Sequence, residues 1–414
     1  MNLVLQHSNI DKSKSSIKIT GSKSETNRLL LLQALYPNIE LKNISQSDDS
    51  NVTEEALRNS QLTAHNSQLI DVHHAGTAMR FLTAFFAIQE NREIVLTGSS
   101  RMKERPIKIL VEALKQLEAE ITYEENEGFP PIRIKGQKIT NNKVTLKADV
   151  SSQYISALLL IAPKLENGLE LTLEGEITSI PYIKMTLALL NEIGVETSFK
   201  NNVIKVNPQF TIHNSQFTIE SDWSSASYFY SIVALSEIGT QITLSSYKQN
   251  SIQGDSALAE IYKDFGVETV FNSNKSITIS KNNNCQLPII NCQLNNSPDI
   301  AQTIAVTCFG LGIACHLTGL HTLKIKETDR LEALKTELSK LGAIISVTND
   351  TLTIEQSNNL IIESSIDTYQ DHRMAMAFAP LALKTALVIN EAEVVSKSFP
   401  TFWEDLKSIG FKME

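Results

Sequence analysis

The stretch SSQYISALLLIA, residues 151–162, is an apolar run that opens with two serines. A run that is apolar on every side predicts a helix buried all round. Five further segments likewise open with a small or polar residue at the expected cap position: SETNRLLLLQAL from Ser24, GTAMRFLTAFFAI from Gly76, SSASYFYSIVAL from Ser224, PDIAQTIAVTCFGLG from Pro298 and DHRMAMAFAPLAL from Asp371. Their first residues are spaced by 52, 75, 73, 74 and 73 positions. A period this long indicates one supersecondary unit repeated six times.

A second, amphipathic helix is expected between these segments, because apolar residues recur there at steps of three and four. It is found in IKILVEALKQLEAEITY from Ile107, IKMTLALLNEIGVETSF from Ile183, LAEIYKDFGVETVF from Leu258, RLEALKTELSKLGAIISV from Arg330 and FWEDLKSIGFKM from Phe402. A glycine follows four of these helices, at Gly194, Gly266, Gly342 and Gly410. Each is expected to be the left-handed residue just past a helix end, where glycine has no Cβ penalty.

Strand-like runs rich in Val, Ile, Thr and Leu separate the helices. They are EIVLTG from Glu93, LELTLEG from Leu169, TQITLSS from Thr240, ACHLTGL from Ala314 and TALVINEA from Thr385. The predicted unit therefore runs buried helix, strand, amphipathic helix, strands, with the amphipathic helix toward water. Residues 51–70 have a helical pattern in one half and no other clear element, so the repeat pattern is weakest in the first unit. Because a single core stops growing near ~250–300 residues, we expect two domains, although the residue pattern does not place the break.

Composition narrows the class of protein. The net charge of -9 argues against general nucleic-acid binding but leaves room for a local basic cleft. The four cysteines form no CxxC pair, and no histidine cluster has metal-ligand spacing, so we expect free thiols and no metal. The N-terminus resembles no signal peptide, and no apolar run reaches the roughly 20 residues that span a bilayer. We therefore expect a cytoplasmic protein with no membrane partner.

The starts of the buried helices carry polar and cationic residues. Helix N-termini offer unpaired N–H groups and partial positive charge, which favour phosphate and carboxylate. The first three starts contain Lys23, Ser24 and Arg28, then Gly76, Thr77 and Arg80, then Ser151, Ser152 and Gln153. Capping by Ser and Thr explains the hydroxyls as well, but it does not explain why Lys or Arg accompanies several starts.

Cations also gather in the loops that follow the strands. They are Arg101, Lys103 and Arg105 in RMKERPI, Lys326 and Arg330 in IKETDR, Arg373 in QDHR, and Lys397 in SKSFP. Arginines at loop tips suggest bidentate recognition of carboxylate or phosphate, and solvated surface ion pairs are the alternative. Asp299 and Glu327 are the candidate carboxylates, because a carboxylate among cations stays ionised and can accept and return a proton. Asp299 as a plain helix cap is the competing interpretation.

Six motifs in this order, GSKSETNRLLLLQAL, AGTAMRFL, RMKERPI, DVSSQY, KETDRL and DHRMAMAF, resemble those of the EPSP synthase (3-phosphoshikimate 1-carboxyvinyltransferase) family. The similarity runs from about Gly21 to Pro400. It implies an α/β fold of two similar domains, each of three βαβαββ-type units with buried helices and outward-facing sheets, an inside-out α/β barrel. It places one domain at residues 20–220 and the other at 1–19 plus 221–414, with the active site in the interdomain cleft.

The resemblance also implies a reaction and its residues. Phosphoenolpyruvate and shikimate 3-phosphate would give 5-enolpyruvylshikimate 3-phosphate and phosphate, in a monomer with no cofactor. The residues implied for shikimate 3-phosphate are Ser24, Arg28, Ser151, Ser152, Gln153, Ser179, Tyr182 and Lys326. Those implied for phosphoenolpyruvate are Lys23, Gly76, Arg105, Gln153, Arg330, Arg373 and Lys397. Asp299 resembles the base on the 5-hydroxyl and Glu327 the proton donor to the methylene carbon, with Lys23 a further candidate for proton transfer.

Four positions depart from the family pattern. Thr20 replaces a proline, His74 and Thr322 replace asparagines, and Phe81 stands where many members have proline. The asparagine replacements put two substrate contacts in doubt, and we expect Phe81 to alter inhibition by glyphosate. Two other functions stay open: a UDP-N-acetylglucosamine enolpyruvyl transferase, which typically has a loop cysteine that is absent before Cys285 here, and a non-catalytic binding protein on the same fold.

Overall fold

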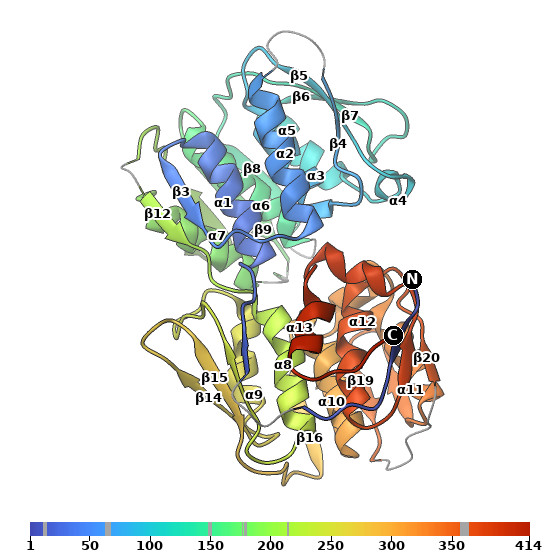
Figure 1. The fold of residues 1–414 in the computed structure, drawn as a ribbon. Helices are drawn as coiled ribbons and strands as arrows, with labels where there is room; N and C mark the ends of the chain where they lie inside the picture. The colour runs from blue at the N-terminus through green and yellow to red at the C-terminus, as the bar shows by residue number, and fades with distance from the viewer. Residues whose placement is uncertain are drawn as a thin grey trace. The chain divides into compact units, whose positions relative to one another are not determined.

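A computed structural model of the protein describes residues 1–10, 15–62, 68–147, 151–175, 177, 180–212, 215–356 and 364–414, and the side chains of all of these except 60–62 and 215. The chain divides into two compact units. We call Ser22–Ile219 the inserted unit, and Met1–Gly21 together with Glu220–Glu414 the terminal unit. Figure 1 shows the helices and strands of each.

Three helices form the core of the inserted unit. They are α1 (Lys23–Leu35), α3 (Gly76–Ala87) and α6 (Ser152–Ile161). The three pack against one another, and α3 buries every residue except Thr77. The remaining helices are α2 (Asp48–Leu62), α4 (Ser100–Lys103), α5 (Lys108–Gln116) and α7 (Ile180–Glu192), with a 3-10 turn η1 (Ala162–Lys164) after α6.

Two four-stranded sheets of the inserted unit share one topology. The first has the order β4 (Gln68–Asp71), β5 (Glu93–Thr97), β7 (Ile132–Lys135), β6 (Glu120–Tyr123), and the second the order β8 (Lys143–Lys147), β9 (Leu169–Glu174), β11 (Val203–Val206), β10 (Thr197–Lys200). In each, the first two strands are parallel and the other neighbours antiparallel, which is the βαβαββ unit. The third sheet contains only the parallel pair β12 (Ser215–Thr218) and β3 (Ile39–Lys42). Its missing hairpin explains why the first helix spacing is the shortest.

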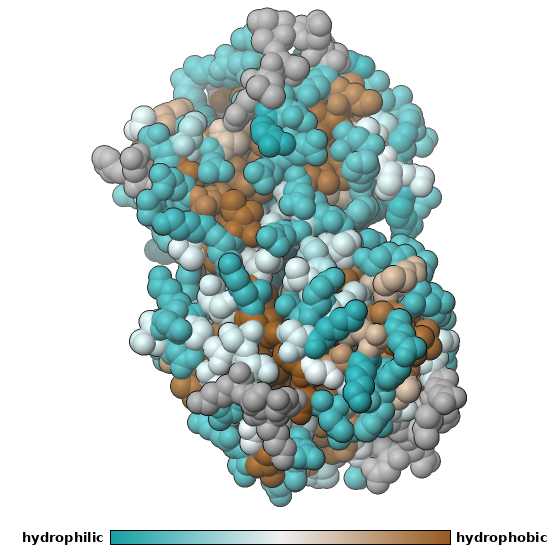
Figure 2. All heavy atoms as spheres, viewed as in Figure 1, coloured by the Kyte–Doolittle hydropathy of each residue, from teal (hydrophilic) through white to brown (hydrophobic). Residues whose placement is uncertain are grey.

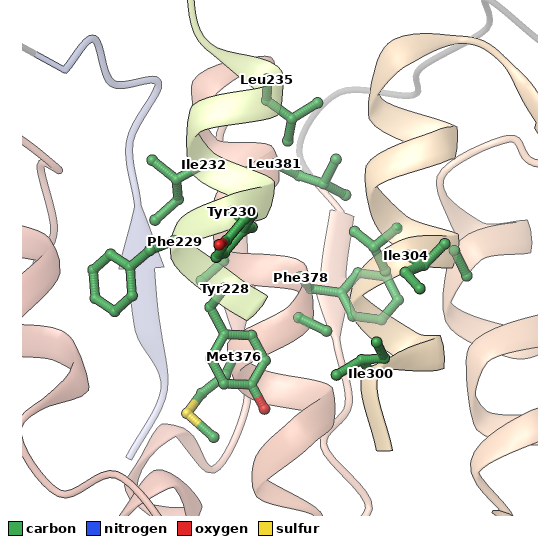
Figure 3. Packing of buried hydrophobic residues seen from close by; sticks show 14 of the residues in the cluster. Tyr228, Phe229, Tyr230, Ile232, Leu235, Ile300, Ile304, Met376, Phe378 and Leu381 are labelled. Atoms are coloured by element: carbon green, nitrogen blue, oxygen red, sulfur yellow. The ribbon is translucent and has the colours of Figure 1, made fainter. Parts of the chain in front are cut away.

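The terminal unit repeats this design around α8 (Trp223–Leu235), α10 (Ala301–Leu311) and α12 (His372–Phe378). Side chains from α8, from α10 and from the stretch that begins with α12 gather in one apolar cluster, which includes Tyr228, Ile304 and Phe378 (Figure 3). The outer helices are α9 (Leu258–Ile261), α11 (Arg330–Lys340) and α13 (Phe402–Ser408). Short 3-10 helices are η2 (Gly254–Ala257), η3 (Pro298–Ile300), η4 (His321–Ile325), η5 (Ala379–Leu383) and η6 (Ala392–Lys397).

Three sheets accompany the helices of the terminal unit. Their strand orders are β14 (Val267–Phe271), β15 (Ile277–Lys281), β13 (Gln241–Leu244), β2 (Ser15–Ile17); then β16 (Ile289–Gln293), β17 (Ala314–Thr318), β19 (Leu352–Ile354), β18 (Ile345–Val347); then β1 (Leu3–Leu5), β21 (Leu387–Ile389), β20 (Ser364–Ile366). The two chain ends lie side by side (Figure 1), and the N–H of Val4 donates to the carbonyl of Glu414 at 3.0 Å.

Two strands pair with strands that are distant in the sequence. Strand β2 precedes α1 in the chain, yet it pairs in parallel with β13 of the terminal unit. Strand β12 precedes α8, yet it pairs in parallel with β3 of the inserted unit. Each unit therefore completes a repeat with a strand that precedes a helix of the other unit. Gly21 and Ser221 form an isolated antiparallel bridge where the chain leaves and re-enters the terminal unit.

The expected fold class is confirmed by this architecture and by the likeness to solved structures described below. All four glycines expected past helix ends have positive φ: 92° at Gly194, 76° at Gly266, 98° at Gly342 and 109° at Gly410. Figure 2 shows mainly hydrophilic side chains on one face of the molecule. No helix among the described residues is long and apolar enough to cross a membrane.

Four of the six expected cap positions are wrong, and Ala75 and Ser297 are the N-caps where Gly76 and Pro298 were expected. The N-cap of α1 is Ser22 and not Ser24, because the Ser22 hydroxyl accepts from the N–H of Glu25. The N-cap of α8 is likewise Asp222 and not Ser224. Ser24 and Ser224 lie in the first turn of these helices, where their hydroxyls are not needed as caps. The second helix of the fourth repeat is also short, since α9 ends at Ile261.

Candidate active site

The residues expected from the sequence to form the site fall into two groups, one in each unit. In the inserted unit they lie at the starts of α1, α3 and α6, on α7 and in the loop after α4. In the terminal unit they lie in η3, in the loop before α11, at the starts of α11 and α12, and at the end of η6. Ser179 lies outside the described residues.

Arg28 is a buried cation of the inserted group, with 3% of its surface exposed. Its Nε donates to the hydroxyl of Thr186 at 2.8 Å and its Nη2 to that of Ser156 at 2.9 Å. Its Nη1 donates to the carbonyl of Ser24 at 2.8 Å, and its Nη2 lies 3.5 Å from the carbonyl of Tyr182. Every hydrogen-bond partner among the described residues is a neutral oxygen, so these bonds solvate the positive charge but do not neutralise it.

Aromatic rings complete the surroundings of Arg28. The guanidinium carbon lies 5.4 Å from the ring centroid of Phe81 and 5.8 Å from that of Tyr182, within cation–π range. Burial lowers the pKa of Arg28 to about 10, against an opposing effect of Tyr182 and Glu25. Among the described residues no carboxylate forms an ion pair with it. This position would therefore gain most from an anionic ligand.

Arg105 approaches the start of α3 because residue 76 is a glycine. A Cβ on Gly76 would lie 2.4 Å from Nη1 of Arg105, closer than any real contact allows. The N-cap of α3, Ala75, has no side chain that can cap, so the first N–H groups of α3 adjoin this guanidinium. A helix N-terminus next to an arginine is suited to a phosphate or carboxylate.

Arg80 binds backbone carbonyls at both ends of the segment that joins the start of α3 to Arg105. It donates to the carbonyls of Gly76 at 3.0 Å and Pro106 at 3.1 Å, and the hydroxyl of Tyr154 also donates to Pro106 at 2.7 Å. Burial, with a smaller contribution from Arg105, lowers the pKa of Arg80 to about 10. Two arginines are thus held close together with no carboxylate partner among the described residues.

The start of α6 lies next to that of α3. The amide of Gln153 donates to the hydroxyl of Thr77 at 3.1 Å, and Ser151 caps α6 by accepting from the N–H of Gln153. Ser152 is the first residue of α6 and is largely buried. Lys23, at the first position of α1, pairs with Asp49 at 3.6 Å. Asp49 was not expected from the sequence.

Arg330 is the centre of the terminal group, and it is only 2% exposed. Its Nε donates to Asp371 at 2.6 Å, its Nη1 to Asp299 at 2.8 Å and its Nη2 to Glu327 at 2.7 Å. Burial alone would lower the pKa of Arg330, but the carboxylates of Asp371, Glu327 and Asp299 outweigh it and raise the pKa. The sequence indicated Arg330 and two of these carboxylates but not the role of Asp371, which is fully buried.

Asp299 contacts three cations. Besides Arg330, the ammonium of Lys326 lies 3.6 Å from its Oδ1 and the guanidinium of Arg373 lies 3.5 Å from its Oδ2. The backbone carbonyl of Asp299 accepts a further hydrogen bond from Arg373 at 3.1 Å. Asp299 is therefore more than a helix cap, because Lys326, Arg330 and Arg373 surround its carboxylate.

Arg373 lies in the first turn of α12, where Asp371 caps the helix by accepting from the N–H of Arg373 at 2.8 Å. Its Nη2 also lies 3.3 Å from the hydroxyl of Ser224. Burial acts to lower the pKa of Arg373, but Asp299 and other neighbours raise it overall. Lys397 lies apart from these carboxylates, and its ammonium donates to the carbonyl of Gln370 at 2.8 Å.

The four departures from the family pattern have different surroundings. Phe81 is buried beneath the guanidinium of Arg28, whereas His74 is exposed. Thr322 lies in η4, and its hydroxyl is buried without a hydrogen-bond partner among the described residues. The carbonyl of Thr20 accepts from the N–H of Asp222. The described residues contain no group of three or more His, Cys, Asp or Glu able to hold a metal ion.

Known proteins resemble this chain over nearly its full length. The sequence profile of the family described as EPSP synthase (3-phosphoshikimate 1-carboxyvinyltransferase) matches residues 8–406. A protein of Bacteroides fragilis named 3-phosphoshikimate 1-carboxyvinyltransferase is 46% identical over 407 residues, 96% of either chain. A protein of the same name from Shewanella pealeana is 35% identical over 425 residues, covering 97% of this chain and 98% of its own.

Solved structures agree on the fold. A structure of EPSP synthase from Acinetobacter baumannii matches with a TM-score of 0.82 at 20% identity, covering 100% of this chain and 99% of that one. A second structure of EPSP synthase from the same organism matches with a TM-score of 0.81 at 21% identity.

Proposed function

Because the chain belongs to the EPSP synthase (3-phosphoshikimate 1-carboxyvinyltransferase) family, we propose that it transfers the enolpyruvyl group of phosphoenolpyruvate to the 5-hydroxyl of shikimate 3-phosphate and releases phosphate. This is a step of the shikimate pathway, which leads to chorismate and the aromatic amino acids. The observation that carries the proposal beyond family membership is the pair of carboxylates, Asp299 and Glu327, held on one buried arginine, Arg330.

The reaction needs a base, an acid and cationic clamps. In the addition step the 5-hydroxyl loses its proton and its oxygen bonds to C2 of phosphoenolpyruvate, while C3 gains a proton. The tetrahedral intermediate then loses a proton from C3 and expels phosphate from C2, which restores the double bond. A carboxylate can accept and return such protons when cations hold it ionised. We assign Asp299 to the 5-hydroxyl and Glu327 to C3, with Lys23 as a further proton-transfer group.

The inserted unit is proposed to bind shikimate 3-phosphate. Arg28 supplies a buried positive charge whose described hydrogen-bond partners are all neutral, and a phosphate or carboxylate would compensate it. Ser24, Tyr182 and Gln153 lie at or next to this arginine and the adjoining helix starts. The remaining assigned contacts are Ser151, Ser152, Ser179 and Lys326.

Phosphoenolpyruvate is proposed to be held by cations of both units acting on one substrate in the interdomain cleft. Arg105 and Gly76 supply a guanidinium beside free N–H groups at the start of α3. The terminal unit supplies Arg330 and Arg373. The other assigned contacts are Lys23, Gln153 and Lys397. Since Arg330 already meets three carboxylates, an anion would replace the most exposed of them, Glu327, whose side chain is 37% exposed.

A phosphate-release assay with both substrates tests this function directly. We expect turnover by the native protein that requires shikimate 3-phosphate. Asp299→Asn keeps the size of the side chain and should lower kcat by ~10²–10⁴, the usual range for losing a general base. Glu332→Gln, on the exposed face of α11, is the matched control and should turn over normally.

Three outcomes would contradict the proposal. Full activity of Asp299→Asn would remove this carboxylate from the chemistry. Phosphate release with UDP-N-acetylglucosamine in place of shikimate 3-phosphate would support the related transferase instead. Tight binding of shikimate 3-phosphate without any turnover would indicate a binding protein. The proposal includes a monomer in the cytoplasm, which gel filtration and cell fractionation test.

A further inference from the structure

One of the six buried-helix starts has no part in the proposed function. It is SSASY from Ser224, at the start of α8, although it occupies the same phase of the repeat as Lys23–Ser24, Gly76 and Ser151. In the terminal unit the starts of α8, α10 and α12 meet, because Ser224 on α8 and Asp299 in η3 both contact Arg373 on α12. The fourth start is therefore next to a proposed substrate ligand.

A chain of hydrogen bonds passes through Ser224. Its hydroxyl donates to Oδ2 of Asp255 at 2.5 Å, and Nη2 of Arg373 donates to the same hydroxyl oxygen at 3.3 Å. Ser224 is 8% exposed and Asp255 is 7% exposed. Asp255 lies in η2, 31 residues along the chain, so the contact depends on the fold of the whole unit.

The direction of these bonds follows from the chemistry of a hydroxyl. Serine has one hydrogen to donate and two lone pairs to accept. When Asp255 takes that hydrogen, the lone pairs of Ser224 are left to face the guanidinium of Arg373. Without the carboxylate the hydroxyl could turn its hydrogen toward Arg373, which would oppose the contact. Asp255 thus acts on the arginine through the serine.

Helix capping does not account for this arrangement. Asp222 already caps α8 by accepting from the N–H of Ser225 at 2.7 Å, so the hydroxyl of Ser224 is not needed as a cap. Nor does Asp255 form an ion pair with any described residue, and Ser224 is its single side-chain hydrogen-bond partner among them. A buried carboxylate without a direct cation costs stability. Such a cost is characteristic of functional sites.

We propose that Ser224 and Asp255 are positioning residues that fix the orientation of the Arg373 guanidinium for phosphoenolpyruvate. The inference deepens the proposed function and rests on it. Arg373 would be held on one side by Asp299 and on the other by the Ser224–Asp255 pair. Since Asp299 is also the proposed base, this arrangement sets the distance between the bound anion and the base.

Steady-state kinetics on four variants test the proposal. Ser224→Ala removes the hydroxyl and should lower kcat/KM for phosphoenolpyruvate about tenfold, the effect of losing one hydrogen bond to a charged group. Asp255→Asn should act in the same direction but less, about threefold, because the amide oxygen can still accept. The double variant should resemble Ser224→Ala alone. The KM for shikimate 3-phosphate should stay within twofold throughout. Asp264→Asn, exposed and nine residues beyond Asp255, is the control and should match the native protein.

Each other outcome overturns the proposal. An unchanged kcat/KM for phosphoenolpyruvate in Ser224→Ala would remove Ser224 from the site. Equal loss for both substrates together with a lowered melting temperature would indicate a purely structural pair. Additive effects in the double variant would show that Asp255 does not act through Ser224. If the native protein releases no phosphate, the proposed function fails. The positioning claim is then decided by calorimetric titration with phosphoenolpyruvate, which should bind more weakly to Ser224→Ala.

Discussion

Two buried arginines, one in each unit, have opposite electrostatic surroundings. Arg28 in the inserted unit is held by hydroxyls, carbonyls and two aromatic rings, and burial lowers its pKa to about 10. Arg330 in the terminal unit is held by three carboxylates, which raise its pKa despite its burial. Arg28 has no ion-pair partner in the part of the chain that the structure describes, whereas the charge of Arg330 is more than balanced by its three carboxylates.

This difference in charge around the two arginines indicates that the two units have different roles. A buried cation with neutral partners is prepared for an anionic ligand, because the ligand supplies the missing charge. A cation shared among carboxylates instead keeps those carboxylates ionised and fixed in place, as proton transfer requires. We therefore expect the inserted unit to contribute most of the affinity for shikimate 3-phosphate, and the terminal unit to hold the carboxylates that transfer protons. Three predictions test this comparison, in decreasing order of expected effect.

Arg330→Met should produce the largest change in stability. It leaves the carboxylates of Asp371 and Asp299 buried without their main cation, and breaking a buried pair in this way costs ~3–5 kcal/mol. The free energy of unfolding, measured in urea, should fall by that amount, and turnover should be lost. Arg101→Met is the control, since Arg101 forms an exposed pair with Glu104 worth ~0–1 kcal/mol. A loss of substrate affinity with unchanged stability would show that the carboxylates do not depend on Arg330.

Asp255→Asn should change how stability depends on pH. Burial, with a further contribution from Asp299, raises the pKa of Asp255 to about 7 from an ordinary value of 3.8. The native state therefore holds this proton more tightly than the unfolded state, so the stability it provides is present below the ordinary pKa and is lost as pH rises toward 7. Between pH 5 and 8 the native protein should lose about 1 kcal/mol or more relative to Asp255→Asn. Parallel stability curves for the two proteins would contradict this account.

Arg28→Met should have the smallest effect on stability. The hydroxyls that Arg28 leaves behind retain partners, because Thr186 can donate its single hydrogen to the carbonyl of Tyr182 at 2.9 Å and accept from the hydroxyl of Ser156 at 3.0 Å. No carboxylate of the described residues forms an ion pair with Arg28, so none of them loses an ion-pair partner. The free energy of unfolding should stay within ~1 kcal/mol of the native value. A loss as large as that of Arg330→Met would mean that the two arginines are equally structural.

Much of the fold was predictable because its signals are local. Buried helices recur with a near-constant period, and the left-handed glycines after four amphipathic helices follow from a short pattern around each helix end. The caps of α1 and α8 were misplaced because Ser22 and Ser24, or Asp222 and Ser224, are equally good caps by residue type. The pairing of β2 with β13 could not be predicted, since it joins segments more than 200 residues apart.

The motifs of the candidate site can be found in the sequence, but the contacts between their side chains cannot. Family motifs contain Arg330 and Asp371, yet the pairing of their side chains joins positions 41 residues apart and depends on the packing of the unit. Ser224 was quoted only as a helix start, and Asp255 lies in a stretch with no local pattern that marks a functional carboxylate. The neutral surroundings of Arg28 were also invisible in sequence, because Thr186 and Ser156 belong to α7 and α6.

The most direct test of these different roles is the dissociation constant of shikimate 3-phosphate, measured by calorimetry for Arg28→Met and Asp299→Asn. Losing a charged, hydrogen-bonded contact should raise the constant for Arg28→Met by ~10–100-fold, while Asp299→Asn should bind within about threefold of the native protein despite its lost turnover. Equal weakening in both variants, or weakening confined to Asp299→Asn, would contradict the account.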